Sequence, residues 1–162
     1  MGLDMYLEAR KYVRKVDWNT TDETGEPVVL PDYQEVAKFF PAGADEFGDY
    51  SGAMVTLNIG YWRKANQIHN WFVTECAGGE DDCKPVYVPS IKLTELLAMV
   101  NAVLEDNADP ASTLPTASGF FFGSTEYDEY YKHDLKRTKS ILEKALALDE
   151  NGDVSFYYQA SW

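Results

Sequence analysis

Both ends of the chain alternate apolar and polar side chains, the pattern typical of β-strands. Near the start the apolar positions are Leu3, Met5, Leu7 and Ala9. Near the end they are Val154, Phe156, Tyr158 and Ala160. Because successive side chains of a strand point to opposite faces, each segment has one face to bury. We therefore expect strands over residues 3–10 and 154–162, paired in one sheet.

A third alternating segment, residues 54–59, predicts another strand, and Gly60 separates it from a predicted helix over residues 61–75. Helical spacing of apolar residues predicts further helices over residues 93–106 and 125–148. Ser124 or Thr125 is the expected N-cap of the last helix. The fold class is therefore α+β: a small antiparallel sheet that includes both terminal strands, covered by about three helices. At 162 residues we expect a single domain, 1–162.

The predicted helix from residue 61 combines an apolar stripe with an unusual set of polar and aromatic side chains. The stripe consists of Tyr61, Ala65, Ile68 and Phe72. Beside it lie Trp62, Arg63, Lys64, Asn66 and His69. Aromatic rings stack on ligands, and Arg, Asn and His give directed hydrogen bonds, so this mixture favours a binding role.

A Gly-Ser-Thr turn at residues 123–125 precedes the last predicted helix. Backbone N–H groups at such a turn attract anions, Arg63 and Lys64 can add charge, and Tyr127 a stacking surface. Neither GxxxxGK[ST] nor GxGxxG is present. The predicted ligand-binding residues are Trp62, Arg63, Lys64, Asn66, His69, Ser124, Thr125 and Tyr127. The simpler explanation is that Ser124 caps a helix and the aromatic residues fill a core.

The net charge of -13, from 14 basic and 27 acidic residues, opposes direct binding to nucleic acid or to an anionic membrane. Residues 61–92 are balanced: Arg63, Lys64, Lys84 and Lys92 stand against Glu75, Glu80, Asp81 and Asp82. A local cationic site is therefore compatible with an acidic protein.

Four segments resemble a family of bacteriophage and bacterial proteins of unknown function. They read MGLDMYL at residues 1–7, GYWRKANQIHNWFV at 60–73, SGFFFGSTEYDEYY at 118–131 and FYYQASW at 156–162. The resemblance spans both ends and the middle of the chain. It implies phage origin and a setting in the cytoplasm of a bacterial host, in line with the lack of an export signal or a membrane-spanning segment.

The first functional hypothesis is a non-catalytic phage accessory protein, an antagonist of host defence, that binds a small anionic, nucleotide-like ligand in an aromatic and basic pocket. The second is an acidic mimic of nucleic acid that binds a host nuclease or polymerase. Its acidic clusters are Asp45, Glu46 and Asp49; Glu80, Asp81 and Asp82; Glu105, Asp106 and Asp109; and Glu126, Asp128 and Glu129. Solubility is the simpler explanation of these clusters.

The third hypothesis is a small nucleotide-acting enzyme with His69 as base. Cys76 is two helical turns, about 10 Å, from His69, so no nucleophile arrangement follows, and we assign no catalytic residue. A zinc site would have to combine His69, Cys76, Cys83 and His133, which lack the close ligand pairs of zinc motifs. We therefore expect neither metal nor cofactor, and Cys76 and Cys83 as free thiols.

Overall fold

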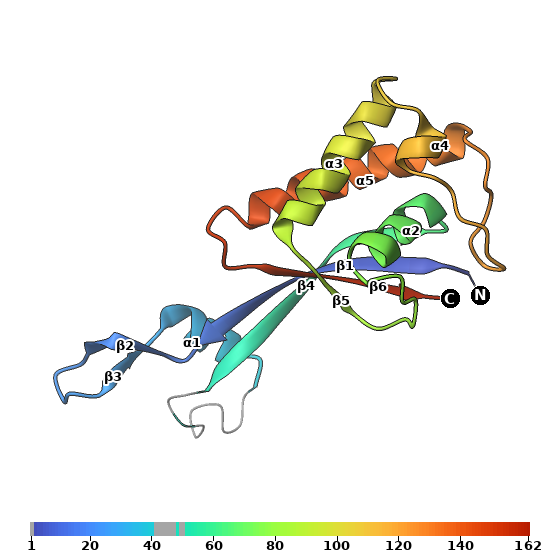
Figure 1. The fold of residues 1–162 in the computed structure, drawn as a ribbon. Coiled ribbons are helices and arrows are strands. Elements are labelled where there is room, and N and C mark those ends of the chain that lie inside the picture. Colours follow the sequence, from blue (N-terminus) through green and yellow to red (C-terminus); the bar gives the residue numbers. More distant parts are fainter. Residues whose placement is uncertain (1, 41–47, 49–50) are drawn as a thin grey trace. The chain divides into compact units, whose positions relative to one another are not determined.

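A computed structural model of the protein describes residues 2–40, 48 and 51–162. Its strands are β1 (Asp4–Arg14), β2 (Val16–Thr21), β3 (Pro27–Val29), β4 (Gly52–Arg63), β5 (Val86–Val88) and β6 (Ser155–Ser161). Its helices are α1 (Pro31–Ala37), α2 (Asn66–Glu75), α3 (Ser90–Leu104), α4 (Pro110–Thr113) and α5 (Glu129–Leu148). One antiparallel sheet has the strand order β4-β1-β6-β5 (Figure 1). The α+β class and the membership of both terminal strands are thus confirmed.

Contacts divide the chain into two compact units, and β1 and β4 contribute to both. The smaller unit is Arg10–Thr56. In it β2 and β3 form an antiparallel hairpin, with Val16 opposite Val29. The Asp22 carboxylate closes the hairpin turn by accepting the backbone N–H groups of Thr24 and Glu26. Residues 22–26 are therefore the tip of this hairpin.

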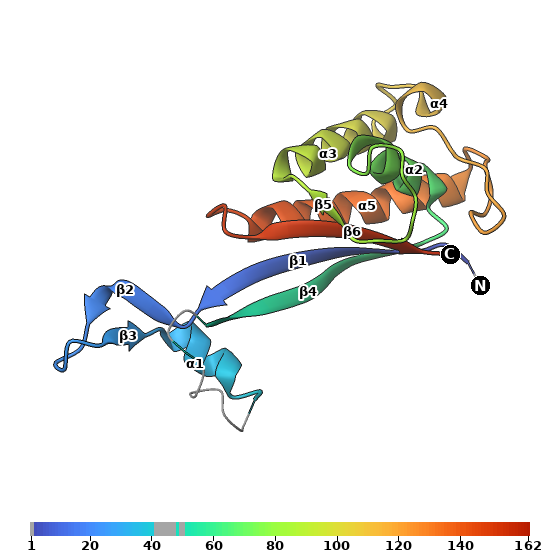
Figure 2. The same ribbon diagram turned by 60° about the horizontal axis from the view of Figure 1, so that its bottom comes forward.

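The larger unit, Met1–Ala9 with Leu57–Trp162, contains the helices α2, α3 and α5 on one face of the sheet (Figure 2). α3 packs along α5. The largest fully buried side chains of the unit are Leu3, Met5, Leu7, Trp62, Ile68, Phe72, Leu93, Leu96, Leu114, Leu135, Leu142 and Phe156. The Phe72 and Tyr158 rings stack at 4.1 Å, which joins α2 to β6. No helix in the described part of the chain has the length and apolarity of a membrane span.

The predicted start of the helix at residue 61 is wrong, because β4 continues to Arg63 and α2 begins only at Asn66. Gly60 is not a break between two elements. A Cβ on Gly60 would lie 2.7 Å from Ile141 Cγ2 and 3.1 Å from Leu7 Cβ, so glycine lets α5 approach the strand. Lys64, with a φ of 62°, turns the chain from the strand toward the helix.

The start of the last helix is also corrected, from residue 125 to Glu129. Asp128 is the N-cap, and its carboxylate accepts the backbone N–H groups of Tyr130 and Tyr131 at 2.9 and 3.2 Å. Ser124 does not cap the helix; its hydroxyl accepts the N–H of Glu126 within the preceding loop. This four-residue difference leaves the loop at 114–128 long enough to form one wall of a hollow.

Candidate functional site

Three of the predicted ligand-binding residues, Trp62, Asn66 and His69, are buried and bonded inside the larger unit. Trp62 is fully buried on β4, and its Nε1 donates to Thr138 Oγ1 on α5 at 2.8 Å. Its ring also packs against Phe72. Trp62 thus joins the sheet to α5, and its ring is not available for stacking on a ligand.

Asn66 is the anchor of the loop that precedes α5. Its Nδ2 donates to the carbonyl groups of Phe122 and Ser124 at 3.0 and 2.8 Å, and its Oδ1 accepts the N–H of Ala117 at 2.9 Å. The side chain is 1% exposed. Because all three bonds reach the loop, Asn66 positions the loop instead of contacting a ligand itself.

His69 has both ring nitrogens engaged. Nδ1 lies 2.7 Å from the Tyr158 hydroxyl, and Nε2 lies 2.9 Å from Asp81 Oδ2. Asp81 Oδ1 also accepts Trp162 Nε1 at 3.2 Å. With the imidazole 2% exposed, it has no nitrogen free to take a proton from a substrate. His69 instead ties the segment after α2 to β6, and the third hypothesis loses its base.

Cys76 and Cys83 are both free thiols. Burial raises the pKa of the Cys76 thiol to about 11, so at neutral pH it is protonated and a poor nucleophile. Among the described residues no group of three or more His, Cys, Asp or Glu side chains is arranged to hold a metal ion.

Several members of the acidic clusters bond within the protein. Asp82 pairs with Lys84, and Asp109 caps α4 by accepting the N–H of Ser112. Asp81 and Asp128 have the internal partners given above. The first predicted cluster, Asp45, Glu46 and Asp49, lies outside the described residues.

The other predicted residues gather around a hollow of about 270 Å³, here called the loop hollow. It is lined by Arg63, Lys64, Gln67, Thr116, Gly123, Ser124, Glu126, Asp128, Tyr130, Tyr131 and Asp134. Of the predicted ligand-binding residues, Arg63, Lys64 and Ser124 line this hollow. Thr125 and Tyr127 are not lining residues.

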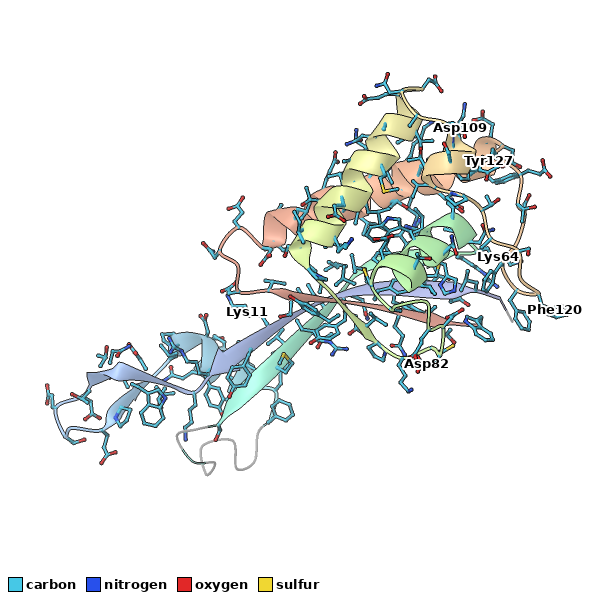
Figure 3. All side chains as sticks on the ribbon, in the orientation of Figure 1. Lys11, Lys64, Asp82, Asp109, Phe120 and Tyr127 are labelled. Carbon is cyan, nitrogen blue, oxygen red and sulfur yellow. The ribbon has the colours of Figure 1, made fainter. Side chains whose placement is uncertain are left out.

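Thr125 and Tyr127 hold the hollow's wall. The Thr116 hydroxyl donates to the Thr125 carbonyl at 3.0 Å, and the Thr116 N–H donates to the Tyr127 hydroxyl at 3.3 Å. Figure 3 labels Tyr127 on this loop and Lys64 on the connection from β4 to α2. The hollow thus lies where two segments distant in sequence meet.

Gln67, on α2, and Asp134, on α5, also line the hollow, and they were not among the predicted residues. Gln67 is 2% exposed, and its Nε2 is 3.5 Å from Asp134 Oδ2, at the outer limit of a hydrogen bond. Burial raises the pKa of the Asp134 carboxyl, and the bond from Gln67 opposes this only in part. Among the described residues the carboxylate has no other side-chain hydrogen bond, so it retains capacity for a donor.

The sequence carried a signal for Asp134, but it was weak. Asp134 precedes buried Leu135 and lies one turn before buried Thr138, at the border of the apolar stripe of α5. A carboxylate at that position is half-buried if the helix packs as expected. Nothing in the sequence indicated that Gln67 would face it from α2.

Comparisons with known protein families, curated protein sequences and solved structures found no match to this chain. The geometry of the loop hollow therefore carries the functional argument.

Proposed function

We propose that the protein binds a small ligand with one anionic group and an edge of N–H donors, as in a mononucleotide, in the loop hollow without converting it. One observation carries this proposal. The cationic side chains of Arg63 and Lys64 line the same hollow as Gln67 and Asp134, which share only one long hydrogen bond. Opposite ends of such a ligand would meet opposite charges.

The anionic group of the ligand would bind at Arg63 and Lys64. The Arg63 side chain is 61% exposed, and its Nε is 3.9 Å from Asp4 Oδ1, a loose contact that leaves most guanidinium donors available. Lys64 has no ion pair within the described residues. An added Cβ on Gly123 would lie 3.2 Å from Lys64 Cβ, so glycine allows the loop to approach this lysine.

The N–H edge would bind at Asp134 and Gln67. A carboxylate can accept two adjacent N–H groups, and the Gln67 amide can both donate and accept. Burial removes water from the ionised Asp134 carboxylate, and the described residues give it no strong hydrogen-bond donor in return. A ligand N–H group would supply that donor.

The charge of the hollow limits the ligand further. Its lining has two cations against three carboxylates, Glu126, Asp128 and Asp134. A polyanion such as a triphosphate would be repelled, whereas a monophosphate that also presents N–H donors is matched. The volume of about 270 Å³ fits a ligand of mononucleotide size or smaller.

The test is thermal stabilisation and calorimetry with a panel of nucleoside monophosphates and the corresponding nucleosides. A ligand at 100 times its Kd should raise the free energy of unfolding by about 2.7 kcal/mol, which is a shift in Tm of several degrees. We expect a monophosphate whose base has adjacent N–H donors to bind most tightly. Because the protein is proposed not to convert its ligand, the monophosphate concentration should remain unchanged during incubation.

Two variants locate the binding. Arg63→Ala and Asp134→Asn should each weaken binding about tenfold, since each removes a charge-assisted hydrogen bond. Lys136→Ala, which also removes a cation, and Asp32→Asn, which also neutralises a carboxylate, are controls at residues that do not line the hollow. The proposal fails if no monophosphate stabilises the protein, or if binding is unaffected by both hollow variants. Turnover of the ligand would contradict the non-catalytic role.

A further inference from the structure

A second hollow, of about 540 Å³, lies around the open edge of β4 and is here called the edge hollow. Its lining residues are Tyr6, Asn58, Ile59, Gly60, Tyr61, Arg137, Ser140, Ile141 and Lys144. All of them belong to the larger unit. None of them lines the loop hollow, so any ligand here would bind independently of the one proposed above.

The charge of the edge hollow is opposite to that of the protein as a whole. Among the residues that the structure describes, the charged ones that line it are Arg137 and Lys144, whereas the chain carries a net charge of -13. Four lining residues of α5 share one face of the helix, because they are spaced i, i+3, i+4 and i+7. They are Arg137, Ser140, Ile141 and Lys144. No carboxylate lines the hollow among the described residues to neutralise the two cations.

Arg137 is held in position by its own contacts. Its Nε donates to the Tyr61 carbonyl at 2.7 Å, and its Cζ lies 5.9 Å from the centre of the Tyr61 ring. The two terminal nitrogens of the guanidinium remain as a fork suited to a phosphate. The described residues offer no hydrogen bond or ion pair to the side chains of Asn58, Ser140 or Lys144.

Two tyrosine rings form the other side of the hollow. Tyr6 and Tyr61 are 36% and 38% exposed, and their ring centres are 5.4 Å apart. The Tyr61 hydroxyl donates to Asp4 Oδ1 at 2.5 Å, which fixes this ring. That hydrogen bond also raises the pKa of Tyr61, so the ring stays neutral. The rings offer an aromatic surface beside the cations.

The backbone of β4 adds polar groups. β4 has a neighbouring strand, β1, on one side only. Arg137 reaches the Tyr61 carbonyl from the other side, and backbone groups alternate in direction along a strand, so the N–H of Ile59 also points to the open side. Gly60 between them allows α5 to pack close enough for Arg137 to reach this edge.

We propose that the edge hollow is a binding site for an organic phosphate, with the phosphate between Arg137 and Lys144 and a ring of the ligand against Tyr6 and Tyr61. The exposed cations and the unpaired hydroxyl and amide groups match the phosphate of such a ligand. The aromatic surface matches its ring. Unlike the loop hollow, this site accepts more than one negative charge.

The experiment is calorimetric titration of the full chain with phenyl phosphate and with pyrophosphate, at low and at physiological salt. We expect both compounds to bind, more weakly at the higher salt concentration. Lys144→Glu should reduce the affinity for both about tenfold or more, because it replaces an attraction by a repulsion. Tyr6→Ala should weaken phenyl phosphate and leave pyrophosphate unchanged.

Lys136→Glu is the matched control, since it makes the same change of charge on α5 outside the hollow. Lys144 is exposed, so its variant should fold, and an unchanged Tm verifies this. Equal losses in the Lys136 and Lys144 variants would show non-specific attraction and overturn the proposal. Absence of binding at millimolar concentration would also overturn it, as would tight binding of single-stranded oligonucleotides in place of both compounds.

The variants also separate the two sites. Arg63→Ala should weaken monophosphate binding at the loop hollow about tenfold and leave pyrophosphate binding intact, whereas Lys144→Glu should weaken pyrophosphate binding and leave the loop hollow unchanged. Loss of pyrophosphate binding in Arg63→Ala with retention in Lys144→Glu would place the anion in the loop hollow and overturn the assignment to the edge hollow.

Discussion

The loop hollow and the edge hollow share helix α5 but differ in charge. The earlier part of α5 gives the loop hollow Tyr130, Tyr131 and Asp134, and the later part gives the edge hollow Arg137, Ser140, Ile141 and Lys144. The first site is a mixture of cations and carboxylates, while the charged residues in the second are cations alone. One amphipathic helix can therefore serve two chemically distinct sites, because each turn presents its polar border to a different neighbour.

The two hollows also differ in how their walls are held. A loop anchored by Asn66 forms one wall of the loop hollow, whereas strand β4 and helix α5 form the edge hollow. β4 is paired with β1 along one edge and α5 is hydrogen-bonded along its length, so the edge hollow should tolerate changes that open the loop hollow.

Asn66→Ala is expected to have the largest effect and to break the comparison most clearly. It removes three partly buried hydrogen bonds to the loop and should lower the free energy of unfolding by about 3 kcal/mol. Thermal or urea unfolding measures this loss. Monophosphate binding at the loop hollow should be lost while pyrophosphate binding remains.

Asn70→Ala, on the same helix and without a side-chain bond among the described residues, is the control for Asn66. It should change stability by less than about 0.5 kcal/mol. A stability loss in Asn66→Ala no greater than in this control would show that Asn66 does not anchor the loop.

Gly60→Ala should act on the edge hollow. The new methyl group would overlap Ile141 Cγ2 at 2.7 Å and would push α5 from β4, with a loss of about 1–3 kcal/mol in the free energy of unfolding. Pyrophosphate affinity should fall because Arg137 and Lys144 move with the helix. Gly48→Ala, whose added Cβ would meet no described residue within 4 Å, should leave stability and binding unchanged. A similar loss in both variants would exclude overlap at Gly60 as the cause.

Asp134→Asn should have the smallest effect on stability and a clear dependence on pH. Burial raises the pKa of Asp134 in the folded protein, so its contribution to stability is complete below its ordinary pKa of 3.8 and is lost as the pH rises through the folded-state value. Asparagine removes this loss. At pH 7 the variant should therefore be more stable by about 0.5 kcal/mol, a modest value because the carboxylate is partly solvated.

The measurement is the difference in Tm between the Asp134→Asn variant and the parent protein from pH 3 to pH 8. This difference should increase with pH, while monophosphate binding by the parent should weaken as the pH falls and Asp134 is protonated. A difference in Tm that is constant across this range would contradict an elevated pKa at Asp134.

Sequence reasoning performed best where the signal was local. The alternation at residues 3–10 and 154–162 predicted β1 and β6, because a strand's burial pattern depends only on which residues follow one another. It failed at Gly60, where a glycine inside a strand was interpreted as a boundary. Glycine is needed at this position because Ile141, which lies on α5, packs against it.

For the candidate site, the chain's local chemistry did not determine the role of each residue. Of the predicted ligand-binding residues, Arg63, Lys64 and Ser124 line the loop hollow. Asn66 and His69 looked equally suited to ligand binding, yet their partners are internal. A polar side chain becomes an anchor or a ligand contact according to what packs against it, which helical spacing does not reveal.

By itself, therefore, the sequence determined the α+β class, the strands at both ends and the apolar faces of the helices, since these follow from short-range periodicity and the burial of apolar surface. Only the tertiary structure decided which polar groups are bonded inside and which face a hollow. The partners of Asn66 lie more than 50 positions along the chain, and Arg137 reaches Tyr61 across 76 positions. Contacts over such separations arise only when the elements have packed together.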